Sequence, residues 1–141
     1  MSQLTVFTDG GARGNPGPAA IGVVVQQDHK TIHEHNNYLG EQTNNVAEYE
    51  ALLYSIGWCQ RFCETQLVES IEFLLDSKLV VEQVQGHWKV KEPHLQVLVA
   101  KARTLLSSLP CSYSFRYIPR AQNAAADKLV NESLDEAVNN S

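Results

Sequence analysis

The N-terminal part of the chain alternates polar residues with β-prone apolar residues, which is the period of a β-strand. This alternation predicts strands at residues 3–8, 19–26 and 31–39, and residues 10–18 between the first two are a loop rich in Gly, Asn and Pro. The first strand is expected to end at the carboxylate of Asp9. Three short strands joined by turns predict an antiparallel meander.

The period changes to that of a helix over residues 45–62, where Asn45 and Glu48 have the spacing of a capping pair. The apolar side chains of this helix recur as Ala47, Ala51, Tyr54, Trp58 and Phe62. The later elements are predicted, in chain order, as a strand at 71–75, a helix capped by Ser77 and reaching about Val84, a helix beginning at Pro93, a strand at 112–117 and a helix from Ala124 to about Val138.

Strands separated by helices favour parallel pairing, whereas the N-terminal meander must be antiparallel. We therefore expect an α/β protein with a five-stranded mixed sheet, in which three antiparallel N-terminal strands are joined by two further parallel strands, flanked by about four helices. A length of 141 residues and the lack of a linker predict a single domain over residues 1–141.

The charge of the chain argues against bulk attraction to nucleic acid or to an anionic membrane, because 11 Lys and Arg face 16 Asp and Glu, for a net charge of -5. No apolar run approaches the ~18 residues of a membrane span. A cytoplasmic monomer that does not contact membranes is expected. The three cysteines do not suggest a disulfide framework, although Cys59 and Cys63, four residues apart, leave free thiols or an oxidised pair as alternatives.

Three acids stand at positions where elements begin or end. Asp9 and Asp76 each follow an apolar strand, and Glu48 lies near the start of the long helix. Each acid alone is better explained as a helix cap or a solvated group. Their joint placement favours a cluster at the carboxyl ends of the strands, and such a cluster would be repulsive without a hard cation such as Mg2+ or Mn2+.

Four separated motifs, which together cover nearly the whole chain, resemble those of type 1 ribonuclease H: FTDGGARGNPGPAAIG, TNNVAEYEALLYSI, FLLDSKLVVEQVQGHWKV and YIPRAQNAAADKL. The resemblance implies the ribonuclease H-like fold and a metal-dependent endonuclease. It also implies two divalent ions, Mg2+ with Mn2+ as a substitute, and an RNA/DNA hybrid whose RNA strand is cut to 5'-phosphate and 3'-hydroxyl ends. The four acidic positions of the family fall on Asp9, Glu48, Asp76 and Asp127.

A two-ion mechanism would give these acids different tasks. Asp9 is expected to bridge the ions, Asp76 and Asp127 to hold the ion that activates water, and Glu48 to hold the opposite ion. An alternative for Asp127 is a first-turn acid stabilised by the helix dipole.

A nuclease that cuts one strand of a hybrid must sense the 2'-hydroxyl. The resemblance places Asn15, Asn44 and Asn45 on the substrate surface and Gly10 and Gly11 beside the RNA backbone. Some relatives carry an Arg where Glu41 stands, which leaves Thr43 and Asn44 as the candidate phosphate contacts. The alternatives are a plain strand connection for the glycines and a helix N-cap for Asn44 or Asn45.

The second half of the chain is basic, since residues 78–128 carry eight Lys and Arg against three Asp and Glu. This polarity can orient a duplex despite the negative total. Lys89 and Lys91 can hold DNA phosphates while Trp88 lies against a deoxyribose. An equally weighted alternative for Trp88 is a partly buried core residue.

The chain departs from the resembling family in two places. Only residues 86–92 separate the second and third helices, so the long basic handle of some members is absent, and we expect more salt-sensitive binding. No His lies between Cys111 and Asp127, where many members carry a mobile one, and Arg120 is the candidate for part of its role.

His33 and His35 alternate on one strand face without a third ligand, so they are predicted to face solvent.

The leading hypothesis is therefore a ribonuclease H acting on RNA/DNA hybrids and, since handle-less relatives include such enzymes, also on RNA/RNA duplexes. The alternatives are an exonuclease or junction resolvase of the same superfamily and a non-catalytic nucleic-acid-binding module. The intact TDGGARGNPGP and TNNVAE motifs argue against the first alternative. All four acids argue against the second, because metal-site carboxylates would repel phosphate.

Overall fold

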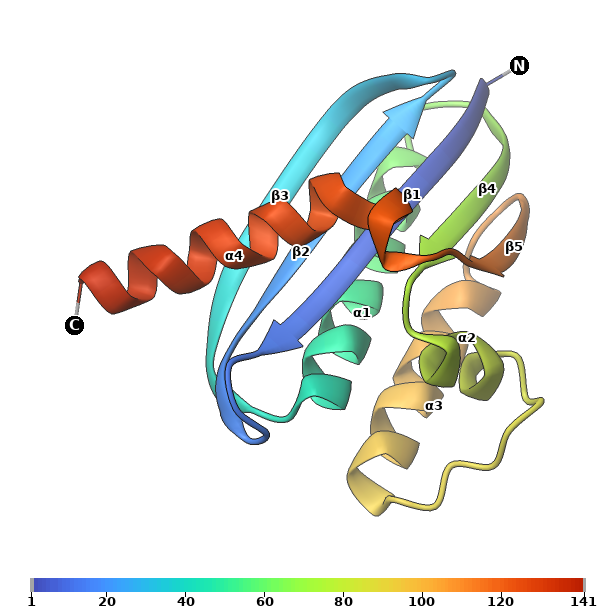
Figure 1. Cartoon of the computed structure of the whole chain (residues 1–141). Helices are drawn as coiled ribbons and strands as arrows, with labels where there is room; N and C mark the ends of the chain where they lie inside the picture. The colour runs from blue at the N-terminus through green and yellow to red at the C-terminus, as the bar shows by residue number, and fades with distance from the viewer. Residues whose placement is uncertain (1, 141) are drawn as a thin grey trace.

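A computed structural model describes residues 2–140, which form one mixed sheet with helices on both faces (Figure 1). The strands are β1 (Ser2–Ala12), β2 (Gly17–Gln27), β3 (Lys30–Gln42), β4 (Val68–Leu75) and β5 (Ser112–Tyr117). The helices are α1 (Asn44–Phe62), α2 (Lys78–Val84), α3 (Pro93–Ser107) and α4 (Ala124–Asn139), with a short 3-10 turn, η1 (Arg120–Asn123), before α4.

The sheet has the strand order β3-β2-β1-β4-β5. β1 pairs antiparallel with β2, and β2 with β3, whereas β4 pairs parallel with β1 and with β5. Helix α4 crosses one face of the sheet, over β1, β2 and β3, and α1 lies on the opposite face with α3 beside it (Figure 1). The predicted fold class is confirmed. None of the helices in residues 2–140 has the length and apolarity required to cross a membrane.

The main core lies between the sheet and α1, α2 and α3, where large side chains such as Tyr49, Phe73 and Ile56 are fully buried. A much smaller cluster lies under α4 and consists of Ala20, Val130 and Leu134. Most of the apolar packing that stabilises the sheet is therefore on the face covered by α1, α2 and α3. On the other face, the backbone of α4 packs closely against the backbone of the sheet.

The first strand is longer than predicted. β1 does not end at Asp9 but continues to Ala12, because Gly10, Gly11 and Ala12 pair in register with Ile21, Ala20 and Ala19 of β2. The predicted loop at 10–18 shrinks to residues 13–16. Gly10 and Gly11, which were predicted to lie in the loop, are instead in extended backbone, a conformation that any residue can adopt.

Helix α1 begins one residue earlier than predicted and has a different cap. The hydroxyl of Thr43 accepts a hydrogen bond from the amide of Val46 at 3.3 Å, so the Asn45–Glu48 capping pair is wrong. The predicted caps and starts of the later helices are confirmed, since Ser77 caps α2 and Pro93 opens α3.

The prediction that His33 and His35 face solvent is wrong, because both rings pack on α1. The ring of His35 stacks on Tyr54 at a centroid distance of 3.9 Å, and the ring of His33 stacks on Trp58 at 4.9 Å. The Nε2 atom of His33 is 2.8 Å from the hydroxyl of Tyr54. Burial lowers the pKa of both histidines; Arg61 lowers that of His33 further, and His33 lowers that of His35.

This ring stack predicts a loss of stability in mild acid. A lowered pKa in the folded state means that the histidines stabilise the fold fully above the ordinary value of 6.5 and progressively less as the pH falls below it. His33→Phe keeps a stacking ring and removes one titration. Between about pH 7.5 and about pH 5, the melting temperature of this variant should therefore fall by a few degrees less than that of the parent. If calorimetric scans show the same fall in melting temperature for both proteins, His33 is not a source of the acid sensitivity.

Candidate active site

Three carboxylates converge where β1, β4 and α1 meet. β1 and β4 run parallel with Thr8 opposite Leu75, so Asp9 and Asp76, the next residue on each chain segment, lie side by side. Glu48 reaches them from the second turn of α1 and accepts a hydrogen bond from the amide of Gly10. One carboxylate oxygen from each of the three acids lies within 4.8 Å of the others. Any two of these three acids are at least 28 positions apart in the sequence, and the fold brings them together.

Two glycines allow the helices to approach this point closely. A Cβ on Gly10 would lie 2.2 Å from the backbone carbon of Ala47 in α1, and a Cβ on Gly22 would lie 2.3 Å from the backbone oxygen of Ala126 in α4. Gly22 is the direct partner of Asp9 in the β1–β2 register. Gly10 therefore admits the helix that carries Glu48, and Gly22 admits the helix that carries Asp127.

The electrostatics of the cluster are unfavourable for three separate charges. Burial, followed by the charges of Asp76 and Asp127, raises the pKa of Asp9 to about 8. Burial and the charges of Asp9 and Asp76 raise the pKa of Glu48 well above its usual range. Burial also raises the pKa of Asp76, and the nearby Arg120 opposes that rise. A bound cation would offset the repulsion between these carboxylates and oppose the rise in their pKa values.

The donor set fits a hard divalent cation. Asp9 and Glu48 are only 5 % and 6 % exposed, so their charges are poorly compensated by water. The Oδ2 atom of Asp76 is buried and has no hydrogen-bond partner among residues 2–140. Buried carboxylate oxygens without partners are suitable ligands for Mg2+ or Mn2+, and the absence of His and Cys from the cluster disfavours zinc.

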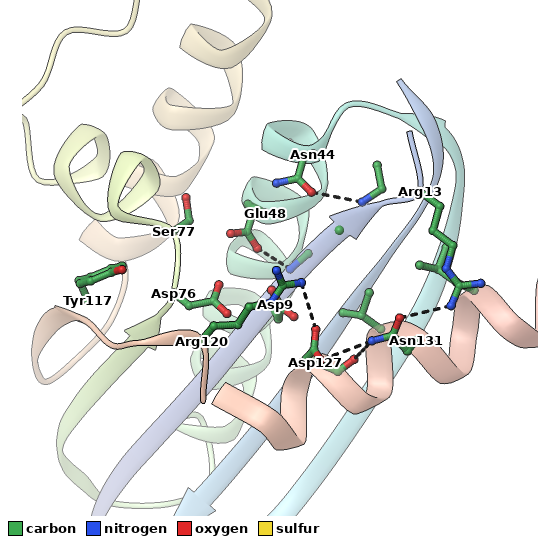
Figure 2. Close-up of a pocket in the computed structure, with 15 residues that line it drawn as sticks. Asp9, Arg13, Asn44, Glu48, Asp76, Ser77, Tyr117, Arg120, Asp127 and Asn131 are labelled. Atoms are coloured by element: carbon green, nitrogen blue, oxygen red, sulfur yellow. Dashed lines mark hydrogen bonds and ion pairs between the residues drawn. The ribbon is translucent and has the colours of Figure 1, made fainter. Parts of the chain in front are cut away.

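The fourth acid, Asp127, lies in the first turn of α4 at the edge of the same pocket (Figure 2). Its Oδ1 atom is 3.6 Å from Nη2 of Arg120. The pocket has a volume of about 360 Å³ and combines these acids with residues from β1, α1 and α4. Of the predicted substrate-binding residues, it includes Gly10, Gly11, Asn44 and Arg120.

Three other predicted substrate-binding residues, Asn15, Thr43 and Asn45, lie beside the pocket. Asn15 accepts a hydrogen bond from the amide of Asn44 at 3.0 Å, and the side chain of Asn44 accepts one from the amide of Ala12 at 3.3 Å. These contacts join the β1–β2 loop to the start of α1. Thr43 and Asn45 flank Asn44 but do not line the pocket.

The predicted DNA-binding residues are on a separate part of the surface. Trp88, Lys89 and Lys91 lie in the segment between α2 and α3, and none of them lines the pocket. Trp88 is 44 % exposed, which favours a surface role over the alternative of a partly buried core residue.

Sequence reasoning missed Asn123, which fixes the start of α4 to the sheet. This side chain is 1 % exposed and donates a hydrogen bond to the carbonyl oxygen of Thr8 at 2.8 Å, next to Asp9. Its Oδ1 atom is buried without a partner among the described residues. The pattern of the sequence only marked Asn123 as the residue before a helix. Other pocket residues that were missed are Arg13, Ser77, Tyr117 and Asn131.

Comparison with known proteins places this fold and its acidic pocket in a defined class. A family model described as reverse transcriptase-like matches residues 7–133. The chain is 40% identical over 136 residues to ribonuclease HI of Halobacterium salinarum, a match that covers 96% of this chain and 66% of that protein. It superposes with a TM-score of 0.90 and 46% identity on a crystal structure of LC11-RNase H1 in complex with an RNA/DNA hybrid, covering 96% of this chain and 99% of that one.

The chain belongs to the type 1 ribonuclease H family. It is also 42% identical over 137 residues to the bifunctional protein Rv2228c of Mycobacterium tuberculosis, where the match covers 96% of this chain and 36% of that protein. The chain thus spans about a third of the length of this relative.

Proposed function

We propose that the chain is a metal-dependent endonuclease that hydrolyses the RNA strand of RNA/DNA hybrids. The observation that supports this most strongly is the convergence of Asp9, Glu48 and Asp76 within 4.8 Å in a pocket that Asp127 also lines. The resemblance of the whole chain to LC11-RNase H1, whose structure was solved with a hybrid, supports the choice of substrate. We further propose that residues 1–141 act as one catalytic domain; the monomeric state and the cytoplasmic location stay predictions.

Asp9, Glu48, Asp76 and Asp127 would hold two divalent ions. Bound ions of this kind lower the pKa of water and stabilise the charge that develops on the attacking and leaving oxygens. In the proposed reaction water adds to phosphorus, the bond from phosphorus to the 3' oxygen breaks, and the leaving oxygen takes a proton. The products are a 5'-phosphate and a 3'-hydroxyl.

The residues around the acids have tasks of their own in this proposal. Gly11 lines the pocket and carries no side chain, so the sugar of an RNA nucleotide can approach its backbone there. Asn44, Asn15, Thr43 and Asn45 supply hydrogen-bonding groups next to that position. Arg120, with a side chain that is 82% exposed, is a cation beside Asp127 that can contact the 5'-phosphate of the product.

A cleavage assay tests the function. A hybrid with a labelled RNA strand should be cut in the presence of Mg2+ or Mn2+ and left intact when a chelator is added. Parallel assays with labelled DNA, single-stranded RNA and an RNA/RNA duplex define the strand specificity, and cleavage of the RNA/RNA duplex would extend the proposal. Cleavage that continues at the same rate in chelator would refute the metal mechanism, and intact hybrid under all conditions would favour a binding module.

Lys89 and Lys91 are proposed to hold phosphates of the DNA strand. Replacing both with Ala is expected to raise the Michaelis constant, leave kcat unchanged and reduce the slope of log affinity against log salt by about two, because each phosphate contact contributes about 0.9 to that slope. The matched control is Lys30→Ala, at the hairpin between β2 and β3. An unchanged salt slope for the double variant would exclude these phosphate contacts.

A further inference from the structure

Asp127 differs from the other acids of the site in how its side chain is held. Asp9 and Glu48 are buried, whereas the side chain of Asp127 is 32% exposed. Helix α4 also has no side-chain cap at its start. Packing alone therefore does not fix the Asp127 carboxylate, and its orientation depends on polar partners.

One such partner is Asn131, a turn further along α4. Its Nδ2 atom donates to the backbone oxygen of Asp127 at 3.1 Å and to the Oδ2 atom of the same residue at 3.4 Å. The opposite oxygen of that carboxylate, Oδ1, lies beside Arg120. Asn131 and Arg120 thus each contact a different oxygen of the Asp127 carboxylate (Figure 2).

Arg13 determines which way the amide of Asn131 points. The guanidinium of Arg13 donates to Oδ1 of Asn131 at 3.2 Å and to Oδ1 of Asp135 at 2.7 Å. A guanidinium has donors and no acceptor, so the oxygen of the Asn131 amide must face Arg13 and its NH2 group must face Asp127. The alternative orientation would place the NH2 group against a cation and the oxygen against a carboxylate.

The contacts of Arg13 with Asn131 and Asp135 contribute little to the free energy of unfolding. The pair of Arg13 and Asp135 has side chains that are 41% and 66% exposed, and exposed ion pairs contribute ~0–1 kcal/mol. What the contact of Arg13 with Asn131 does achieve is a link across 118 residues of sequence, from the loop that follows β1 to the helix that carries Asp127.

We propose that Asn131, oriented by Arg13, is a positioning residue that holds the Asp127 carboxylate ready for a divalent ion. This inference rests on the proposed function of the site. Hydrogen-bond partners of metal ligands typically contribute ~10–100-fold to ion affinity or activity. Because the contact here is long and partly exposed, we expect an effect at the lower end, about tenfold.

The test measures ion binding without substrate. Mn2+ is titrated into the full chain by calorimetry, and the melting temperature is recorded in chelator. Asn131→Ala and Arg13→Ala should each weaken Mn2+ binding several-fold to about tenfold, while the melting temperature in chelator changes little. The matched control is Glu132→Gln on the next position of α4, which removes an exposed pair with Lys128 and should leave Mn2+ binding unchanged.

A double-mutant cycle separates positioning from a general effect. In an Asp127→Asn background, Asn131→Ala should cause no further loss of Mn2+ affinity, because the carboxylate that it positions has been removed. An unchanged affinity in Asn131→Ala, or an equal loss in both backgrounds, would overturn the positioning role while leaving the proposed function intact. A parent protein that binds no divalent ion would overturn both.

Discussion

Asp9→Asn is expected to reduce the rate of hybrid cleavage by roughly a thousandfold or more, which corresponds to about 4 kcal/mol of lost transition-state stabilisation. Asp9 lies at the centre of the acidic cluster, and both Glu48 and Asp76 have a raised pKa in this surrounding. An amide of the same size keeps the packing and removes the charge that would bridge two ions. Single-turnover cleavage at saturating Mg2+ measures the loss, and a rate within tenfold of the parent would exclude Asp9 as a ligand.

The same substitution is expected to stabilise the protein in chelator at neutral to weakly alkaline pH. The pKa of Asp9 is raised from 3.8 to about 8, so the folded state retains a proton that the unfolded state has lost. The contribution of this group to stability is full below about pH 4 and is lost as the pH rises toward 8. An Asn side chain at this position does not titrate, so it adds no pH dependence to the stability. The melting temperature of Asp9→Asn should exceed that of the parent at about pH 8 in chelator and should no longer rise on addition of Mg2+.

Gly10→Ala and Gly22→Ala are each expected to destabilise the fold by about 3 kcal/mol or more. The added methyl group would lie 2.2 Å from backbone in α1 or 2.3 Å from backbone in α4, and backbone cannot move aside as a flexible side chain can. Overpacking of a close-packed interior typically costs 1–3 kcal/mol, and contacts this short belong at or above the upper end of that range. Urea unfolding curves measure the effect as a lower midpoint.

Gly57 and Gly11 supply matched controls, because an added methyl group has room at both positions. A Cβ on Gly57, inside α1, meets nothing closer than Arg61 at 3.6 Å, so Gly57→Ala should stabilise the fold by about 0.5–1 kcal/mol through helix propensity. Gly11→Ala has room as well and should fold normally, yet it should raise the Michaelis constant if an RNA sugar approaches there. A stable Gly10→Ala or Gly22→Ala would show that the helices pack less closely than the structure indicates.

The periodicity of the chain predicted the order and type of the elements because each has a strong local pattern. The strand at β4, the Ser77 cap and the Pro93 start are confirmed since they depend on residues within a few positions of one another. The end of β1 was predicted too early for the opposite reason. Whether Gly10 and Gly11 form a loop or a strand depends on pairing with β2, which a local pattern does not contain.

The two histidines of β3, the strand that pairs with the other edge of β2, also show that a local pattern does not contain tertiary contacts. His33 and His35 have the spacing of one strand face, but which face α1 covers is a property of the layer arrangement. An isolated pair of polar rings on a strand was therefore predicted to face solvent, while the aromatic side chains of Tyr54 and Trp58 provide a stacking surface for them.

By itself, the sequence determined that this is a mixed α/β protein of the type 1 ribonuclease H family, because four separated motifs must agree for such a resemblance. Only the tertiary structure decided how the acids are held. Glycines opposite and adjacent to Asp9 set the distance of two helices from the sheet, and Arg13 contacts Asn131 across 118 residues of sequence. These features depend on contacts between distant segments, and such contacts leave no period in the sequence.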